Sequence, residues 1–250
     1  MVTSISSGEL GGGATKARAA EGSATGASVS NDSAPIHFMG RRSTAAALVA
    51  GAVLNAASSF VNTAFLQGEA TVANYIEAFS ERGGLGMLGV LVNIVGIPLL
   101  LAGLVGLLQL ASPKAPIVGR IAVAATTVGM VAFLCMNGAL LALYSFGSGG
   151  AAGAASAAEQ LMVASPGMLA LLVPFLLGNA VGMVCTAIAL LKSRVTALWV
   201  PVALLLFFVL DFLVPAMAFF DTHLLFVAFA VGAGASVLRR RPQAFPQHRP

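Results

Sequence analysis

One aspartate interrupts one of the most apolar stretches of the chain. Asp211 stands in LLLFFVLDFLVP (204–215), where it has no Lys, Arg or His among its neighbours. A carboxylate in an apolar environment is costly unless it finds a partner. Three roles are therefore open: a protonated carboxyl that links two buried side chains, a group in contact with water, or a group that binds a proton or a cation.

Two asparagines are candidate partners for this aspartate. Counted from the expected outer ends of their helices, Asn93, Asn137 and Asp211 each lie roughly eight or nine residues in, or about 12–14 Å. Asn55 and Asn179 lie deeper by the same count. Buried polar side chains should face the interior of a helical bundle and pair there. The sequence thus predicts a polar layer of Asp211, Asn93 and Asn137, which is a candidate ion or substrate site.

Glycines recur at helical spacing in the stretches that carry these polar residues. Glycine lets two helix backbones approach closely, which is how helices pack within a membrane. We expect packing within one bundle, with contact between copies of the chain as the alternative. The candidate packing residues are Gly89, Gly96 and Gly103 in one stretch, and Gly178 and Gly182 in another.

The composition indicates which environment surrounds these helices. The chain of 250 residues is 58% hydrophobic and only 9% charged, whereas a soluble domain carries roughly 25% charged residues. Several apolar runs reach about 20 residues, the length that crosses a hydrocarbon core of about 30 Å. The fold class is therefore all-α, a polytopic membrane protein with the lipid bilayer as its principal partner.

The apolar runs predict a bundle of six transmembrane helices within residues 41–241. Residues 1–40, rich in Gly, Ser, Ala and Thr, predict a disordered cytoplasmic tail, and residues 242–250 predict a second, short one. Met39 precedes a basic and then apolar stretch, so translation from Met39 is an alternative to Met1. The expected helices are 43–66, 84–111, 120–146, 166–191, 195–219 and 222–238.

The charges predict how the bundle is oriented. Of the 13 Lys and Arg residues, all except Arg82 fall in the two tails, in the connection between the second and third expected helices, or in that between the fourth and fifth. The opposite set of connections holds the acidic residues Glu69, Glu77, Glu81, Glu159 and Asp221. Because basic residues stay on the cytoplasmic side, we expect both termini in the cytoplasm of a plasma (inner) membrane. Asp221 and His223 form an expected polar cap at the outer start of the last helix.

Several classes of function lack their motifs in this sequence. There is no HExxH, GxSxG or Walker A pattern, so we predict that the chain is not an enzyme. Cys135 and Cys185 lie in separate apolar runs, and no Cys/His cluster predicts a metal or another cofactor. The basic residues abut helix ends without aromatic interleaving, which argues against nucleic acid as a partner.

The sequence leaves two functional hypotheses. The first is a non-enzymatic accessory or structural membrane subunit, with a membrane-protein partner or a second copy of the chain. The second is a small proton- or cation-coupled transporter that uses the polar layer around Asp211. The position of Asp211 relative to Asn93 and Asn137 is the feature that distinguishes them.

Overall fold

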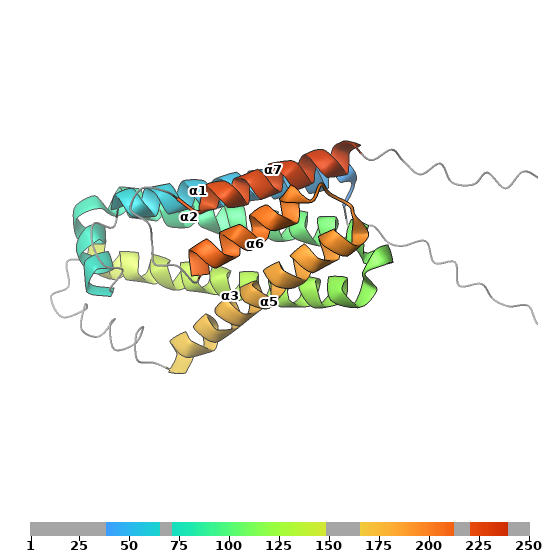
Figure 1. Cartoon of the computed structure of the whole chain (residues 1–250). Coiled ribbons are helices and arrows are strands. Elements are labelled where there is room, and N and C mark those ends of the chain that lie inside the picture. Colours follow the sequence, from blue (N-terminus) through green and yellow to red (C-terminus); the bar gives the residue numbers. More distant parts are fainter. Residues whose placement is uncertain (1–38, 66–71, 149–165, 213–220, 240–250) are drawn as a thin grey trace, which may run out of the picture. The chain divides into compact units, whose positions relative to one another are not determined.

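Six α-helices make up the described part of the chain in a computed structural model (Figure 1). The structure describes residues 39–65, 72–148, 166–212 and 221–239, all within one compact unit, 37–250. These ranges contain no β-strand, so their fold is all-helical. The elements are α1 (Arg41–Phe65), α2 (Val72–Ala111), the 3₁₀ turn η1 (Ser112–Lys114), α3 (Pro116–Ser148), α5 (Pro166–Ser193), α6 (Trp199–Phe212) and α7 (His223–Arg239).

Four of these helices are long and apolar enough to cross a membrane. They are α1, α2, α3 and α5, whose apolar spans run from 25 to 39 residues. The other two, α6 and α7, are apolar but shorter, with 14 and 17 residues. The chain therefore has the helices of a multi-pass membrane protein.

The observed helix limits correct the predicted ones in three places, of which the simplest is α3, predicted from residue 120 and observed from Pro116. Next, the helix predicted at 195–219 begins at Trp199, because Arg194 adopts a positive φ of 51° that ends α5. Pro201 consequently lies in the first turn of α6, where its missing N–H is tolerated, and does not interrupt the helix. The predicted remainder of this helix, 213–219, lies outside the described residues, as do 1–38 and 240–250 of the chain.

Finally, α2 begins earlier than predicted. Residues 72–81, expected in a connection, are helical, and the helix is broken at Arg82 (φ −132°, ψ 30°). The apolar helix predicted at 84–111 thus follows a short helical segment that carries Glu77 and Glu81. Pro98 in α2 and Pro174 in α5 remain inside their helices.

The helices α1 and α2 pack as a close antiparallel pair. A Cβ on Gly96 would lie 3.0 Å from the Cβ of Leu54, and one on Gly89 would lie 3.0 Å from a side-chain carbon of Val61. A Cβ on Gly103 would collide with the backbone of Leu48. Each predicted packing glycine of α2 therefore faces α1 and permits backbone contact.

A second antiparallel pair consists of α3 and α5. A Cβ on Gly178 would lie 2.6 Å from the backbone N of Gly129, and one on Gly182 would lie 2.5 Å from Oγ1 of Thr126. The predicted packing glycines of α5 are thus contact points with α3. The remaining two helices, α6 and α7, pack against each other as a hairpin, and the ring centroids of Phe207 and Phe226 are 4.8 Å apart between them. In addition, α7 packs on α1.

Large apolar side chains cover the outside of the bundle as well as its core. Only 22% of the apolar span of α5 is buried, and its Leu177 is 61% exposed. Val95 of α2 and Val128 of α3 are more than half exposed. Such surfaces suit hydrocarbon rather than water.

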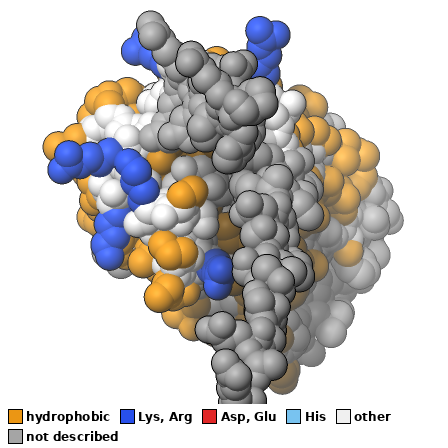
Figure 2. Space-filling view, turned by 90° about the vertical axis from the view of Figure 1, so that its right-hand side faces the viewer, with side chains coloured by type: hydrophobic (Ala, Val, Ile, Leu, Met, Phe, Trp, Pro, Cys, Tyr) orange, Lys and Arg blue, Asp and Glu red, His pale blue; other side chains and the backbone are white. Residues whose placement is uncertain are grey.

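Charged side chains divide between the two ends of the bundle. Figure 2 shows Lys and Arg side chains gathered on the end that faces right in Figure 1. This end consists of the start of α1, the turn from α2 to α3, the turn from α5 to α6 and the end of α7. Its described basic residues are Arg41, Arg42, Lys114, Arg120, Lys192, Arg194 and Arg239.

Candidate functional site

Three asparagines form a hydrogen-bonded chain through the core. Asn55 of α1 donates from Nδ2 to Oδ1 of Asn93 on α2 (3.0 Å), and Asn93 donates from Nδ2 to Oδ1 of Asn137 on α3 (3.2 Å). Asn137 in turn donates to the backbone oxygen of Phe133 (2.9 Å). All three asparagines are buried. This series of hydrogen bonds thus links three helices, and the central Asn93 uses both its Oδ1 and its Nδ2.

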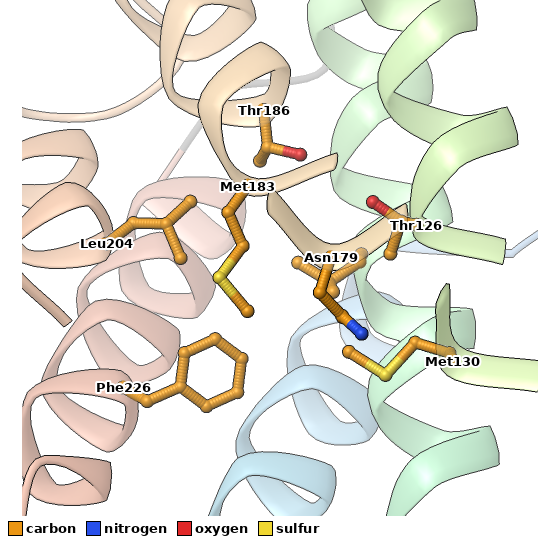
Figure 3. Close-up of a pocket in the computed structure, with 8 residues that line it drawn as sticks. Thr126, Met130, Asn179, Met183, Thr186, Leu204 and Phe226 are labelled. Atoms are coloured by element: carbon orange, nitrogen blue, oxygen red, sulfur yellow. The ribbon is translucent and has the colours of Figure 1, made fainter. Parts of the chain in front are cut away.

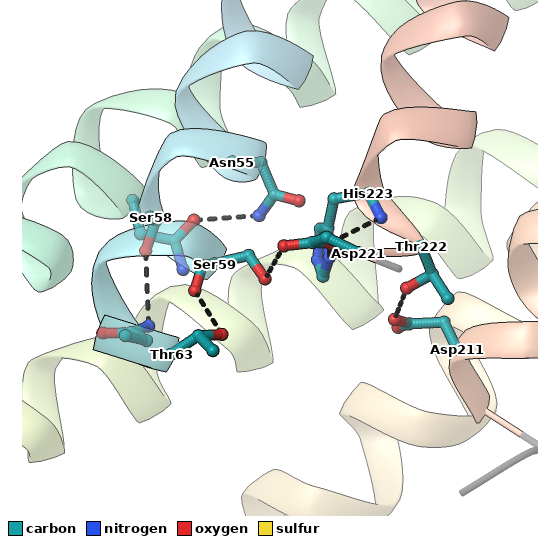
Figure 4. Close-up of polar contacts among 10 residues, drawn as sticks. Asn55, Ser58, Ser59, Thr63, Asp211, Asp221, Thr222 and His223 are labelled. Atoms are coloured by element: carbon teal, nitrogen blue, oxygen red, sulfur yellow. Dashed lines mark hydrogen bonds and ion pairs between the residues drawn. The ribbon is translucent and has the colours of Figure 1, made fainter. Parts of the chain in front are cut away.

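The structure brings Asn93 and Asn137 together but does not join Asp211 to them. Asp211 is exposed, in the last described turn of α6. Its Oδ1 accepts a hydrogen bond from Oγ1 of Thr222 (2.6 Å), immediately before α7. This bond places Asp211 level with the start of α7 (Figure 4).

Sequence reasoning missed the place of Asn55 in this chain. Counting along the helix placed Asn55 deeper than Asn93, whereas the two amides are directly bonded. A usable signal existed, because Ala47, Gly51 and Asn55 recur every four residues on one face of α1. That face contacts the glycines of α2, so any polar residue on it must meet α2.

A second polar group lies at the start of α7. Asp221 accepts at Oδ1 from the backbone N of His223 (2.9 Å), and Nδ1 of the His223 ring lies 2.9 Å from the same oxygen. Ser59 of α1 donates to Oδ2 of Asp221 (2.9 Å). An aspartate that accepts a bond from the backbone two residues on makes a local turn. Asp221 therefore caps α7 and ties it to α1 (Figure 4).

Asp211 and His223 lie at a cavity between helices. The cavity has a volume of about 60 Å³ and is also lined by Asn55, Asn179 and Leu100. Met130, Met183 and five phenylalanines complete the wall. Asn93 and Asn137 do not line it. Thus Asp211 shares the cavity with asparagines, but with Asn55 and Asn179 rather than with the two predicted from sequence.

A smaller cavity adjoins this one further along α5. Its volume is about 10 Å³, which is at the lower limit for one water molecule. It shares Met130, Asn179, Met183 and Phe226 with the larger cavity and adds the hydroxyl-bearing Thr126 and Thr186 (Figure 3). Polar side chains therefore continue from the cavity at Asp211 toward the interior of the bundle.

Within the ranges that the structure describes, no three His, Cys, Asp or Glu side chains come together as a metal site. Cys135 and Cys185 are free, and Cys135 is exposed.

Comparison with protein-family models, with curated proteins and with solved structures finds no match to this chain.

Proposed function

We propose that this chain is a plasma-membrane (inner-membrane) protein whose six helices all cross the bilayer, with both termini in the cytoplasm. The division of charge between the two ends of the bundle is the observation that carries this topology. The basic end meets the rule that Lys and Arg remain cytoplasmic. Among described residues of the other end, Glu77, Glu81 and Asp221 outnumber Arg82.

The two short helices fit this topology as one hairpin. At a rise of 1.5 Å per residue, the described residues of α6 and α7 extend about 21 Å and about 26 Å, against a hydrocarbon core of about 30 Å, and a bilayer accommodates a shorter span by thinning around it. Arg194 precedes α6 and Arg239 ends α7, both at the basic end. The hairpin thus leaves from the cytoplasmic face and returns to it.

A reporter fused after Arg241 tests whether the number of crossings is even, as this topology requires. A reporter that is active only in the cytoplasm should be active at this position, and one that is active only outside should be silent. The reverse pattern would require an odd number of crossings. The same pair of reporters inserted at Gly150, between α3 and α5, is the internal control and should give the opposite result.

Within the membrane, the chain acts as a non-enzymatic accessory or structural subunit. The buried asparagine chain supports this role, because its amides hydrogen-bond one another and the backbone and so hold helices together. The apolar exterior of α5 supplies a surface for a membrane-protein partner or for a second copy. Native mass spectrometry of the chain, extracted with its surrounding lipid, should find a complex of fixed stoichiometry. A chain of 25.2 kDa with lipid alone would contradict the role.

A specific observation favours a second candidate, a small proton- or cation-coupled transporter. Asp211 lines a cavity from which Asn179, Thr126 and Thr186 continue inward. On this candidate, Asp211 binds the coupling ion, so Asp211→Asn should abolish proton- or Na⁺-dependent uptake in cells that express the chain. Uptake that is unchanged in this variant would rule out a coupling role for Asp211.

A further inference from the structure

We propose that the cavity at Asp211 binds a small protonated amine, of the size of ammonium or methylammonium. The proposal concerns binding alone. It shares Asp211 with the transporter candidate, so binding is measured apart from uptake, and either can fail without the other. Aromatic rings make up much of the wall: Phe133, Phe175, Phe207, Phe212 and Phe226.

The volume of the cavity limits the size of the ligand. A water molecule needs about 10–15 Å³ of such space, and a cavity of about 150 Å³ holds benzene. The cavity measures about 60 Å³. It therefore has room for a molecule of a few non-hydrogen atoms and not for a drug-sized compound.

The asparagine side chains of the wall favour a ligand that donates hydrogen bonds. Asn55 and Asn179 use their Nδ2 groups to donate to Asn93 and to the backbone of Phe175 (2.8 Å). Each therefore keeps its side-chain oxygen as an acceptor. In Figure 4 the oxygen of Asn55 points away from its hydrogen bond, toward the start of α7.

The charge of the wall favours a cation. Asp211 is the one carboxylate among the lining residues, and its bond from Thr222 occupies only Oδ1. The lining residues include no Lys or Arg. His223 is held by Asp221 and lies edge-on to Phe207, with ring centroids 5.6 Å apart. The carboxyl group of Asp211, with its Oδ2 not engaged by Thr222, is therefore the group of the wall that a cation would meet.

The aromatic rings decide which cation fits. A bare metal ion takes most of its ligands from oxygen atoms, whereas an ammonium group is also attracted to the face of an aromatic ring. Phe133 and Phe175 lie with centroids 5.0 Å apart, and Phe175 and Phe212 lie 6.2 Å apart. A methylammonium ion can place its N–H groups on the oxygens and its methyl group against the rings.

A binding titration tests the proposal. Isotope-labelled methylammonium is added to the purified full chain in lipid nanodiscs, at constant ionic strength in NaCl, and binding is followed by NMR. We expect saturable binding with one site per chain. Asp211→Asn should raise Kd about tenfold, as expected for loss of a charge-assisted hydrogen bond. Phe175→Leu should raise Kd about threefold, in line with loss of one ring from the site.

Matched control variants separate this site from general effects of charge and shape. Glu81→Gln removes an exposed carboxylate of α2 outside the cavity, and Phe60→Leu removes an exposed ring of α1. Both should leave Kd within about twofold of the original chain. Absence of saturable binding would overturn the proposal, as would equal weakening by Asp211→Asn and Glu81→Gln.

Discussion

The bundle holds its polar residues in two different ways. Between α1, α2 and α3, the asparagine chain is buried, and glycines bring α1 and α2 into backbone contact. Where α5, α6 and α7 meet the first three helices, Asp211 is exposed and lines a cavity of about 60 Å³ to which all six helices contribute. The difference shows that a polar residue in an apolar helix can serve packing in one region and face an open cavity in another.

The largest expected effect tests the close packing of the first region. In Gly103→Val the new side chain would collide with the backbone of Leu48, which cannot move without shifting α1. We expect the free energy of unfolding to fall by about 3 kcal/mol. Unfolding in mixed micelles of detergent and denaturant measures it. Gly138→Val is the matched control, because a Cβ at Gly138 meets nothing within 4 Å. Equal losses in both variants would contradict close packing at Gly103.

A smaller effect tests the asparagine chain itself. Asn93→Ala removes a donor and an acceptor together and leaves the amides of Asn55 and Asn137 without this partner. We expect a loss of about 1 kcal/mol in the free energy of unfolding. In a double-mutant cycle, Asn137→Ala should cost less in the Asn93→Ala background than alone. Strictly additive losses would show that the two amides do not interact.

The smallest effect on stability is expected in the second region. Asp211→Asn keeps a side-chain oxygen that can accept the hydrogen bond from Thr222. Because the side chain is exposed, the free energy of unfolding should change by no more than about 0.5 kcal/mol. A thermal unfolding scan beside Asn93→Ala measures both variants under one condition. A loss at Asp211 as large as that at Asn93 would remove the distinction between the two regions.

The helices were predictable from sequence because their signal is local. Continuous apolar runs gave limits for α1, α5 and α7 within two residues of the observed ones. The break at Arg82 and the late start of α6 were not predictable in this way. The positive φ of Arg194 and the non-helical φ and ψ of Arg82 are backbone conformations that a run of apolar residues does not predict.

The candidate site was predictable only in part, because depth was counted along single helices. That count assumes parallel axes and known helix ends, whereas α5 and α6 run obliquely to α1 and α2 (Figure 1). It gave Asn93 and Asn137 a common depth, and their amides are hydrogen-bonded in the structure. It could not reveal that Asp211 meets Thr222, because that contact depends on how α6 and α7 join.

Thiol labelling in intact cells tests most directly both the orientation and the contrast between the two regions. In a background with Cys135→Ser and Cys185→Ser, a membrane-impermeant maleimide is applied to single-cysteine variants. Asp211→Cys should be labelled from outside, Arg120→Cys only after lysis, and Asn93→Cys in neither case. Labelling of Arg120→Cys in intact cells would reverse the orientation, and labelling of Asn93→Cys from outside would show that the asparagine chain is open to water.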